Sequence, residues 1–484
     1  MAQTTNGAKI TESYEFKTDI ITSYSGIEQR IKTRQVPRHY MSFDYDAMNL
    51  YQAQWLRGMS RIPQNETWYV PLWCREVFLK EDFTEHGKIL YIDTDYFYNL
   101  DGVEWIEVFF HDDFTQKECN IVRRVDHYSS NAITLRKKID IPLYAANTHI
   151  FPLIKCSVQP NGEINYIYSN GTKTSMSFED LLIEPLINIP YNYRTEYDYG
   201  FDKNQQLKQL KEDTQYKKGD IIKINGQYLE CKQGGKTEKQ SIDISNQHIG
   251  IDIRYGTAIF SIISPYKGMS QFNRWNLPEK ENGIDILLNE PQWIDDSGYS
   301  IEIDRNTNKL DTETGIFLYD MKNKSTYDTH TSSIILKGIK QINNMIKFFK
   351  NMSGMQKSFY APTGVNDLEA GMTIWGNKNV IYTIYTNLYK FYANNSRKKK
   401  IVVFTTDWQS YIFEIKSYTH EKIGNIDYGK LILTEEAGVT IPIEKIKMIS
   451  YLNRVRFCSD KLTLNYESVT VAQTTLAMKE VDDT

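Results

Sequence analysis

The residue types that could carry chemistry occur in this chain without the spacing that the chemistry requires. Gly235-Lys236-Thr237 has the last three residues of a phosphate-binding loop, but Glu230 replaces the glycine that must begin such a loop. Asp304-Arg-Asn-Thr-Asn308 begins like a calcium loop, yet Lys309 stands where the sharp turn needs glycine. We therefore expect neither a nucleotide site nor a calcium site.

Acidic and histidine residues could serve hydrolysis or metal binding, but their surroundings favour structural roles. Asp93, Asp95 and Asp101 could be paired carboxylates for glycoside hydrolysis, yet they lie among turns, where aspartate is common. His111-Asp112-Asp113 would alternate between the faces of a strand and could not hold one ion together. The sequence thus predicts no catalytic residue, no metal, no cofactor, and a protein that is not an enzyme.

A basic run, Arg397-Lys-Lys-Lys400, could bind phosphate or nucleic acid. Asn394-Asn395-Ser396 just before it is a turn cluster, so we expect a solvated loop that leads into a strand at Ile401. The chain has 57 basic and 61 acidic residues, a near balance that argues against coating DNA.

Length and composition predict a soluble globular protein. A chain of 484 residues exceeds what one core usually organises, so we expect two or three domains. The five cysteines are scattered and never in a Cys-x-x-Cys pair, which suits synthesis in a reducing compartment. We expect no export signal and no membrane insertion, because no apolar run approaches the length of a membrane span.

Residues 1–13 are polar and predict an N-terminal arm. A helix is expected to begin near Asp44, with Met48, Tyr51, Trp55 and Met59 on one face. After Pro63 the pattern changes to period two. Strands are expected at 68–73, 88–92, 105–110 and 132–135.

The same order recurs about three hundred residues later. An apolar stripe predicts a second helix that ends before Gly354, and it consists of Ile335, Ile339, Ile342, Ile346 and Phe349. Strands are expected at 380–385, 400–405, 410–415 and 431–433.

Single residues in the two segments also correspond. The step Tyr-x-Pro ends at Pro71 in one segment and at Pro362 in the other, and Cys156 and Cys458 close the segments in the same way. These parallels predict a mainly β fold with α (α+β), built as two duplicated helix-plus-β-sandwich or barrel units, 14–200 and 256–484.

Between these units, residues 201–255 are expected to be a linker with a small inserted β-module. Asn225-Gly226 between two β-like runs suits a tight type I′ hairpin. Tyr216 or Tyr228 in this module could stack on the face of a sugar.

Several short segments resemble tail proteins of long-tailed bacteriophages. Phe16-Lys-Thr-Asp-Ile20, Gly26-Ile-Glu-Gln-Arg30 and Pro37-Arg38 are similar to the start of such proteins. Phe359-Tyr-Ala-Pro-Thr363 with Asp367-Leu368, and Arg454-x-Arg456-Phe-Cys-Ser-Asp460, look like their second half. The similarity covers most of residues 14–200 and 290–480.

The resemblance implies a structural virion component at the tail tip, similar to distal tail or minor tail proteins. Such a protein would be made in the host cytoplasm and would form or join a homo-oligomeric ring. Its other partners would be the tail tube protein and hub or baseplate proteins, with a receptor-binding protein or a host-surface glycan as further candidates.

Four charged residues near the start are the candidate assembly residues: Glu28, Arg30, Arg34 and Arg38. Guanidinium and carboxylate groups match bidentately, so these residues could form a network within or between subunits. They could equally be unrelated surface charges. The alternative functions are a carbohydrate-binding adhesin, indicated by the aromatic content, and, with less support, a polysaccharide-degrading enzyme.

Overall fold

The computed structural model describes residues 10–482 except for 24–26, 48, 62, 64–65, 85–86, 93–102, 113–116, 130, 160–162, 169–170, 182–207, 225–226, 240–251, 264–279, 288–298, 305–306, 312, 314, 316, 322–325, 387–391, 393–394, 396 and 408. The described residues form mostly strands, so the fold is mainly β.

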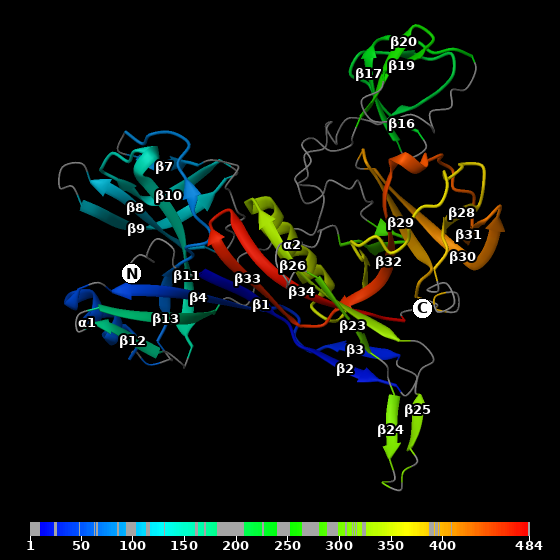
Figure 1. Cartoon of the computed structure of the whole chain (residues 1–484). Helices are drawn as coiled ribbons and strands as arrows, with labels where there is room; N and C mark the ends of the chain where they lie inside the picture. The colour runs from blue at the N-terminus through cyan, green and yellow to red at the C-terminus, as the bar shows by residue number, and fades with distance from the viewer. Residues whose placement is uncertain are drawn as a thin grey trace.

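One strand joins the two halves of the chain. β1 (Ile10–Glu15) lies antiparallel between β4 (Arg38–Ala47) and β33 (Lys461–Ser468) (Figure 1). Residues 10–13 therefore belong to the central sheet, and the prediction that they are part of an arm was wrong. The hydrophobic core around Tyr14 and Phe43 is continuous with the core around Ile346 and Phe457, so both halves share it.

In the first half, β11 (Thr148–Val158) organises the strands. It pairs with β5 (Trp68–Pro71), β8 (Trp105–Asp112) and β13 (Gly171–Asp180). From β8 the pairing continues through β9 and β10 to β7, while β12 and β4 flank β13. The remaining bounds are β6 (Val77–Phe78), β7 (Gly87–Tyr91), β9 (Lys117–Tyr128), β10 (Ala132–Ile139) and β12 (Glu163–Tyr168).

In the second half, β32 (Ile446–Phe457) organises the strands. It pairs with β27 (Phe359–Pro362), β29 (Lys400–Thr405) and β34 (Val471–Glu480). The pairing runs from β29 through β30 and β31 to β28, while β33 and β26 flank β34. The bounds are β26 (Tyr327–Lys337), β28 (Val380–Ile384), β30 (Ser410–Ile423) and β31 (Ile426–Leu433). The strands expected in both halves are all present.

The first helix starts later than its pattern indicated. Asp44 lies within β4, and α1 (Leu50–Met59) begins after Asn49, whose side chain accepts a hydrogen bond from the Gln52 amide. Its buried residues are Ala53 and Leu56, whereas Tyr51 is exposed. The helix starts late because β4 occupies residues 38–47. Of the expected stripe, Trp55 and Met59 pack against the core as predicted, Tyr51 does not, and Met48 lies outside the described residues.

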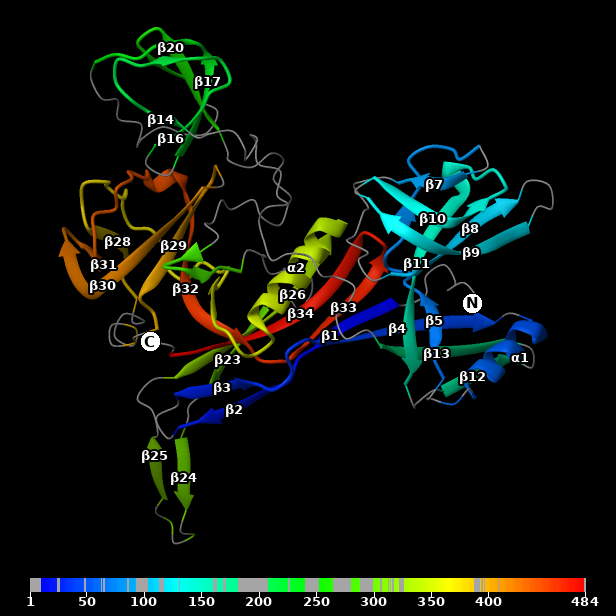
Figure 2. The same cartoon turned by 180° about the vertical axis from the view of Figure 1, so that it is seen from behind.

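The second helix occupies the centre of the molecule (Figures 1 and 2). α2 (Ile339–Met352) buries Ile339, Ile342, Ile346 and Phe349, as the apolar stripe predicted, while Ile335 belongs to β26. The chain leaves the helix through Ser353 and Gly354, which both have positive φ.

Two hairpins lie at one end of the sheet in both views. One consists of β2 (Thr18–Thr22) and β3 (Glu28–Lys32), and the other of β24 (Thr307–Asp311) and β25 (Phe317–Met321). β23 (Tyr299–Asp304) precedes the second hairpin and pairs with β26. A third, short hairpin is formed by β21 (Lys280–Glu281) and β22 (Ile284–Asp285).

The inserted module stands apart from the body (Figure 1). The expected hairpin is present as β16 (Ile221–Ile224) and β17 (Gln227–Gln233). The module is larger than expected, because β17 also pairs with β20 (Ala258–Ile263), beyond the predicted limit at residue 255. Its other strands are β14 (Lys208–Gln209), β15 (Gln215–Tyr216), β18 (Gly235–Lys236) and β19 (Asp252–Tyr255).

The module has its own small core around Tyr216, Leu229 and Phe260, which shares no residue with the other two cores. Replacing residues 208–263 with a short glycine-serine linker should therefore leave the body folded. We expect an unchanged thermal unfolding midpoint for the body, measured by calorimetry. A body that no longer unfolds cooperatively would show that the module belongs to it.

Candidate functional site

Glu28 and Arg30, two of the candidate assembly residues, take part in an ion network within the chain. Arg456 of β32 donates from Nε (2.6 Å) and Nη2 (2.7 Å) to the two carboxylate oxygens of Glu28. Arg30 Nε lies 3.8 Å from the same carboxylate. This bidentate pair fastens the β2–β3 hairpin to the second half of the chain.

A second polar contact fastens the start of the same hairpin. Asp460 accepts hydrogen bonds from the backbone and the hydroxyl of Thr18, and from the Met355 amide at 2.9 Å. Gly354 lies so close that an added Cβ would be 2.4 Å from the Asp460 carboxylate, which explains why glycine follows the helix here.

The other two candidate residues have separate partners. Arg34 donates to the Glu15 carbonyl at 2.7 Å, and Arg38 pairs with Glu179 at 3.4 Å on the surface. The expected single network of Glu28, Arg30, Arg34 and Arg38 is therefore three separate contacts.

Tyr216, a candidate for glycan stacking, is buried in the module. Its ring packs edge-on against Phe260, and its hydroxyl accepts from the Lys211 amide. A buried ring cannot stack on a sugar, so this prediction was wrong. Tyr228 lies in β17, but its side chain is outside the described part of the structure, as are the side chains of Asp93, Asp95, Asp101 and His111-Asp112-Asp113.

The sequence did not indicate the deepest polar site, which surrounds Glu12 of β1. Tyr14 and Tyr466 donate their hydroxyls to its carboxylate at 2.8 and 2.6 Å, and Arg75 donates at 2.9 Å. His39 Nε2 lies 2.9 Å from Glu12, and its Nδ1 lies 3.3 Å from Asp180.

Arg75 extends this site to the central helix, because it also donates to Asn343 of α2 at 3.0 Å. Glu12, Arg75, His39 and Tyr14 are all buried. A single carboxylate thus connects β1, β4, β33, the loop after β5 and, through Arg75, α2.

The surroundings fix the charges of this Glu12 site. Burial opposes ionisation of Glu12, but Arg75 and His39 outweigh it and hold the pKa of Glu12 well below its usual range. Burial also opposes a charged His39, yet the hydrogen bonds to Asp180 and Glu12 raise the pKa of this imidazole. Burial lowers the pKa of Lys350, whose ammonium lies over the Tyr14 ring, to about 8.

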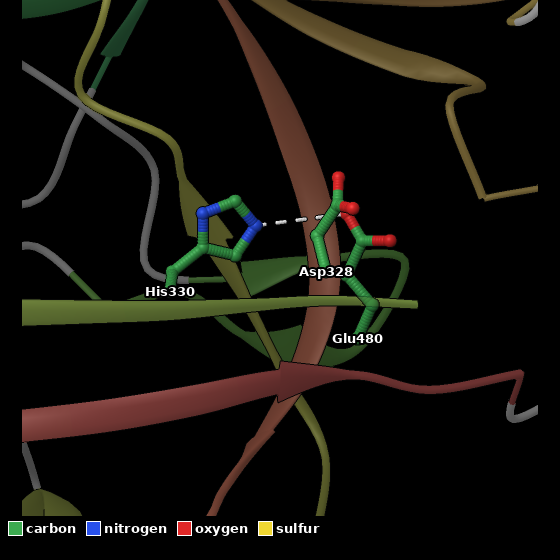
Figure 3. Close-up of side chains that lie close together, drawn as sticks. All are labelled: Asp328, His330 and Glu480. Carbon is green, nitrogen blue, oxygen red and sulfur yellow. Dashed lines mark ion pairs between the residues drawn. The ribbon is translucent and has the colours of Figure 1, made fainter. Parts of the chain in front are cut away.

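A second buried cluster lies where β26 meets β34 (Figure 3). Asp328, His330 and Glu480 each offer a ligand atom within 4.8 Å of the others, which is the spacing of a metal site. However, Lys398 Nζ lies 3.1 Å from Asp328 and also donates to Glu480. The ammonium already occupies the space between the two carboxylates, and Arg397 Nε lies 3.6 Å from Glu480 as a second cation, so the arrangement is a salt-bridge network rather than a metal centre.

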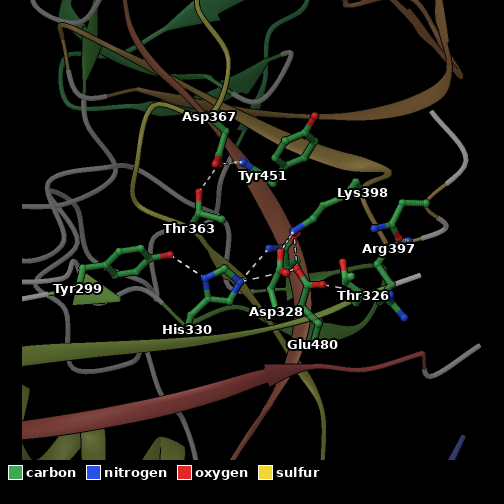
Figure 4. Close-up of polar contacts among 12 residues, drawn as sticks. Tyr299, Thr326, Asp328, His330, Thr363, Asp367, Arg397, Lys398, Tyr451 and Glu480 are labelled. Carbon is green, nitrogen blue, oxygen red and sulfur yellow. Dashed lines mark hydrogen bonds and ion pairs between the residues drawn. The ribbon is translucent and has the colours of Figure 1, made fainter. Parts of the chain in front are cut away.

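Charge states in this cluster also oppose catalysis. Burial works against the ammonium of Lys398, but Glu480 and Asp328 raise its pKa, and an ammonium is not a nucleophile. His330 Nδ1 and the Tyr299 hydroxyl are hydrogen-bonded at 2.7 Å (Figure 4), yet burial raises the pKa of Tyr299, so no phenolate forms. The adjacent cavity of about 10 Å³ has room for about one water molecule and not for a substrate.

The basic run is part of this network rather than a solvated loop. Arg397 pairs with Asp482 at 2.7 Å and also donates to the Thr326 carbonyl (Figure 4), while Lys400 pairs with Glu281 at 2.6 Å. Arg397, Lys398 and Lys400 are all buried. The prediction of a solvated loop was therefore wrong, because the acidic partners come from distant strands.

Strand alternation would have indicated which charges are buried. In β4, His39, Met41, Phe43, Tyr45 and Ala47 are all buried at every second position. In β34 the same holds for Ala472, Thr474, Leu476, Met478 and Glu480. A charged residue in phase with an apolar face is the signal for a buried ion, although it does not identify the partner.

No protein-family model and no curated protein matches this chain. Among the described residues, none of the helices is long and apolar enough to cross a membrane.

The Glu12 site predicts a large cost for losing one partner. Arg75→Met leaves a buried carboxylate undercompensated, which should lower the free energy of unfolding by about 3–5 kcal/mol. Urea denaturation measures this change. The control is Arg124→Met, because Arg124 pairs with Glu104 on the surface and should contribute at most about 1 kcal/mol. Equal losses in the two variants would contradict the assignment.

The same site predicts how stability depends on pH. The folded state binds the His39 proton more tightly, so stability should fall as pH rises above the usual histidine value of about 6.5. Lys350 has the opposite sign, because its pKa is lowered from 10.5 to about 8, so stability should rise with pH between these values.

Denaturation across this pH range measures both slopes. His39→Gln should remove the fall, and Lys350→Met should remove the rise. If both variants keep the wild-type profile, other groups control it.

Proposed function

We propose that this chain is a non-enzymatic structural protein of a bacteriophage tail tip or baseplate. It forms or joins a ring at the distal end of the tail tube and connects the tube to hub or receptor-binding components. It is made in the host cytoplasm and functions in the virion.

The main support is that the family-like segments from opposite ends of the sequence contact one another. Glu28 of the opening segment binds Arg456 of the closing segment, and Thr18 of the first binds Asp460 of the second. Residues that carry the resemblance thus help to fasten the two halves together. Such use of charged side chains suits a scaffold better than a catalyst.

We also propose that residues 38–180 and 327–480 are two copies of one unit. The strand registers support this: Pro71 pairs with Leu153 and Pro362 with Leu452, each at the end of its strand. Asp180 pairs with Cys156 as Glu480 pairs with Val455. In this register the counterpart of Cys156 is Val455 rather than Cys458.

The alternative of a carbohydrate-binding adhesin has lost one of its supports, since Tyr216 is buried. A polysaccharide-degrading enzyme would need an open site with carboxylates. The Glu12 and Glu480 carboxylates are buried in ion pairs, and in the open pocket lined by Glu81 and Asp82 the Asp82 carboxylate accepts a hydrogen bond from the Ala145 amide. The scaffold therefore remains the function that the geometry favours.

The direct test is to locate the chain in the particle. An antibody against the protruding module, residues 208–263, should label purified phage at the tip of the tail in electron micrographs. Label on the capsid, or particles that lack the chain, would refute the proposal.

Among the candidate assembly residues, Arg38 gives the cleanest variant, because its side chain is 55% exposed. Arg38→Glu should change the free energy of unfolding by at most about 1 kcal/mol. If Arg38 contacts a neighbouring subunit, the yield of infectious particles should fall about tenfold, since like charges across an interface disfavour docking. Arg124→Glu is the matched control, with 42% exposure. Normal yield for both variants would remove Arg38 from the interface.

A further inference from the structure

The buried cluster where β26 meets β34 contains the three groups that can join two side chains covalently. Lys398 Nζ lies 3.1 Å from Asp328 Oδ2 and also donates to Glu480 (Figure 4). Amide formation requires an amine, a carboxyl carbon and a second carboxylate that accepts the proton of the amine. The three groups come from different segments, since Asp328 is on β26, Glu480 is on β34 and Lys398 precedes β29.

The cluster is shielded from water. Lys398 and Glu480 are both buried. Lys398 Nζ lies 5.7 Å from the ring centroid of Tyr392 and 5.5 Å from that of Tyr451. Burial against such rings favours the uncharged forms of an amine and a carboxyl group, and it is one way in which proteins make a lysine nucleophilic. The Asp328 side chain is 14% exposed, which leaves a path for a released water molecule.

The surroundings give different roles to the two carboxylates. Glu480 also faces Arg397 Nε at 3.6 Å and His330 Nε2 at 3.7 Å. Burial raises the pKa of Glu480, but the hydrogen bond to His330 and the charge of Lys398 outweigh it and hold this pKa below its usual range. Among the described residues, the ion pair with Lys398 is the one that Asp328 makes. Asp328 is therefore the carboxyl group that can take up a proton, while Glu480 stays ionised as a base.

We propose that Lys398 and Asp328 form an intramolecular isopeptide bond. One proton moves from the Lys398 ammonium to Asp328, which gives a neutral amine and a neutral carboxylic acid without changing the net charge of the cluster. The lone pair of Nζ then forms a bond to Cγ of Asp328. Glu480 takes a proton from Nζ and delivers it to the departing hydroxyl as the C–O bond breaks. One water molecule leaves and one amide remains, so no other reactant is required.

The resting ammonium opposes catalysis over many turnovers, but a reaction within one chain needs the neutral amine only once. The fold already holds the reacting groups together, and intramolecular reactions of well-oriented groups reach effective concentrations of about 10⁵–10⁸ M. Even a slow reaction can therefore go to completion.

The bond links two residues that are 70 positions apart in the sequence. The closed segment contains α2, β27, β28 and most of β26, so the central helix stays attached to the second half when the strands around it open. A covalent link of this kind stabilises mainly by restricting the unfolded chain. It suits a scaffold that carries load, although the bond itself does not depend on a place in a phage tail.

Mass spectrometry of the intact full chain under denaturing conditions tests the proposal. The wild-type mass should be lower than the sequence predicts by one water molecule. Tandem mass spectrometry of a protease digest should find the peptides of Lys398 and Asp328 joined. Lys398→Arg and Asp328→Ala should each have the full mass of their sequences. Glu480→Gln should lose the water at least about a hundredfold more slowly, because the base is gone.

Lys400→Arg is the matched control. Lys400 also contacts two carboxylates, Glu281 and Glu414, but the Glu414 side chain is 48% exposed, so solvent favours the charged forms there. This variant should still lose one water molecule. Wild-type protein that keeps its full mass after prolonged incubation, or a crosslink between other residues, would overturn the proposal. Because this result comes from the wild type, a variant that fails to fold cannot leave the proposal undecided.

Discussion

The architecture depends on burying one ionised carboxylate. Moving such a group out of water costs several kcal/mol unless charged and hydrogen-bonding partners replace the solvent. Glu12 has partners from four places in the chain: Tyr14 beside it, His39 on β4, Arg75 after β5 and Tyr466 on β33. Any shift of β1 against its neighbours would leave this charge without some of its partners. The site therefore specifies the register of the strand that joins the two halves.

The second buried network applies the same constraint at the other end of the sheet. Asp180 and Glu480 occupy matching registers in β13 and β34. His39 lies against Asp180, whereas Lys398 donates to Glu480. If the halves are copies, the position of the buried carboxylate was kept while its cationic partner changed. Both solutions avoid an unpaired buried charge, which is the physical requirement that both halves share.

Local patterns in the sequence were enough to find the eight strands expected in the two halves and α2, because alternation and the apolar stripe are properties of neighbouring residues, but β9, β13, β26 and β34 were not expected. They were not enough to find the ion networks. The partners of Glu12 are 27 residues away at His39, 63 at Arg75 and 454 at Tyr466. The start of α1 was misplaced because Asp44 is a good N-cap by residue type, whereas pairing with β13 keeps it in a strand. The C-terminal limit of the module was placed too early in the sequence. The reason is that β20 pairs with β17, from which it is far apart in sequence.

Charged and apolar side chains have divided roles in the β2–β3 hairpin. Its inward residues Thr18, Glu28 and Lys32 bond to Asp460, Arg456 and Ser353 of the body. They therefore stabilise the monomer. Its outward residues, Ile21 and Ile31, contribute little to the monomer because they stay in water. Since the period of a strand is two, neighbouring residues in one short segment face the body and the solvent in turn. A change on the outer face therefore leaves intact the ion pair and the hydrogen bonds that hold the hairpin in place.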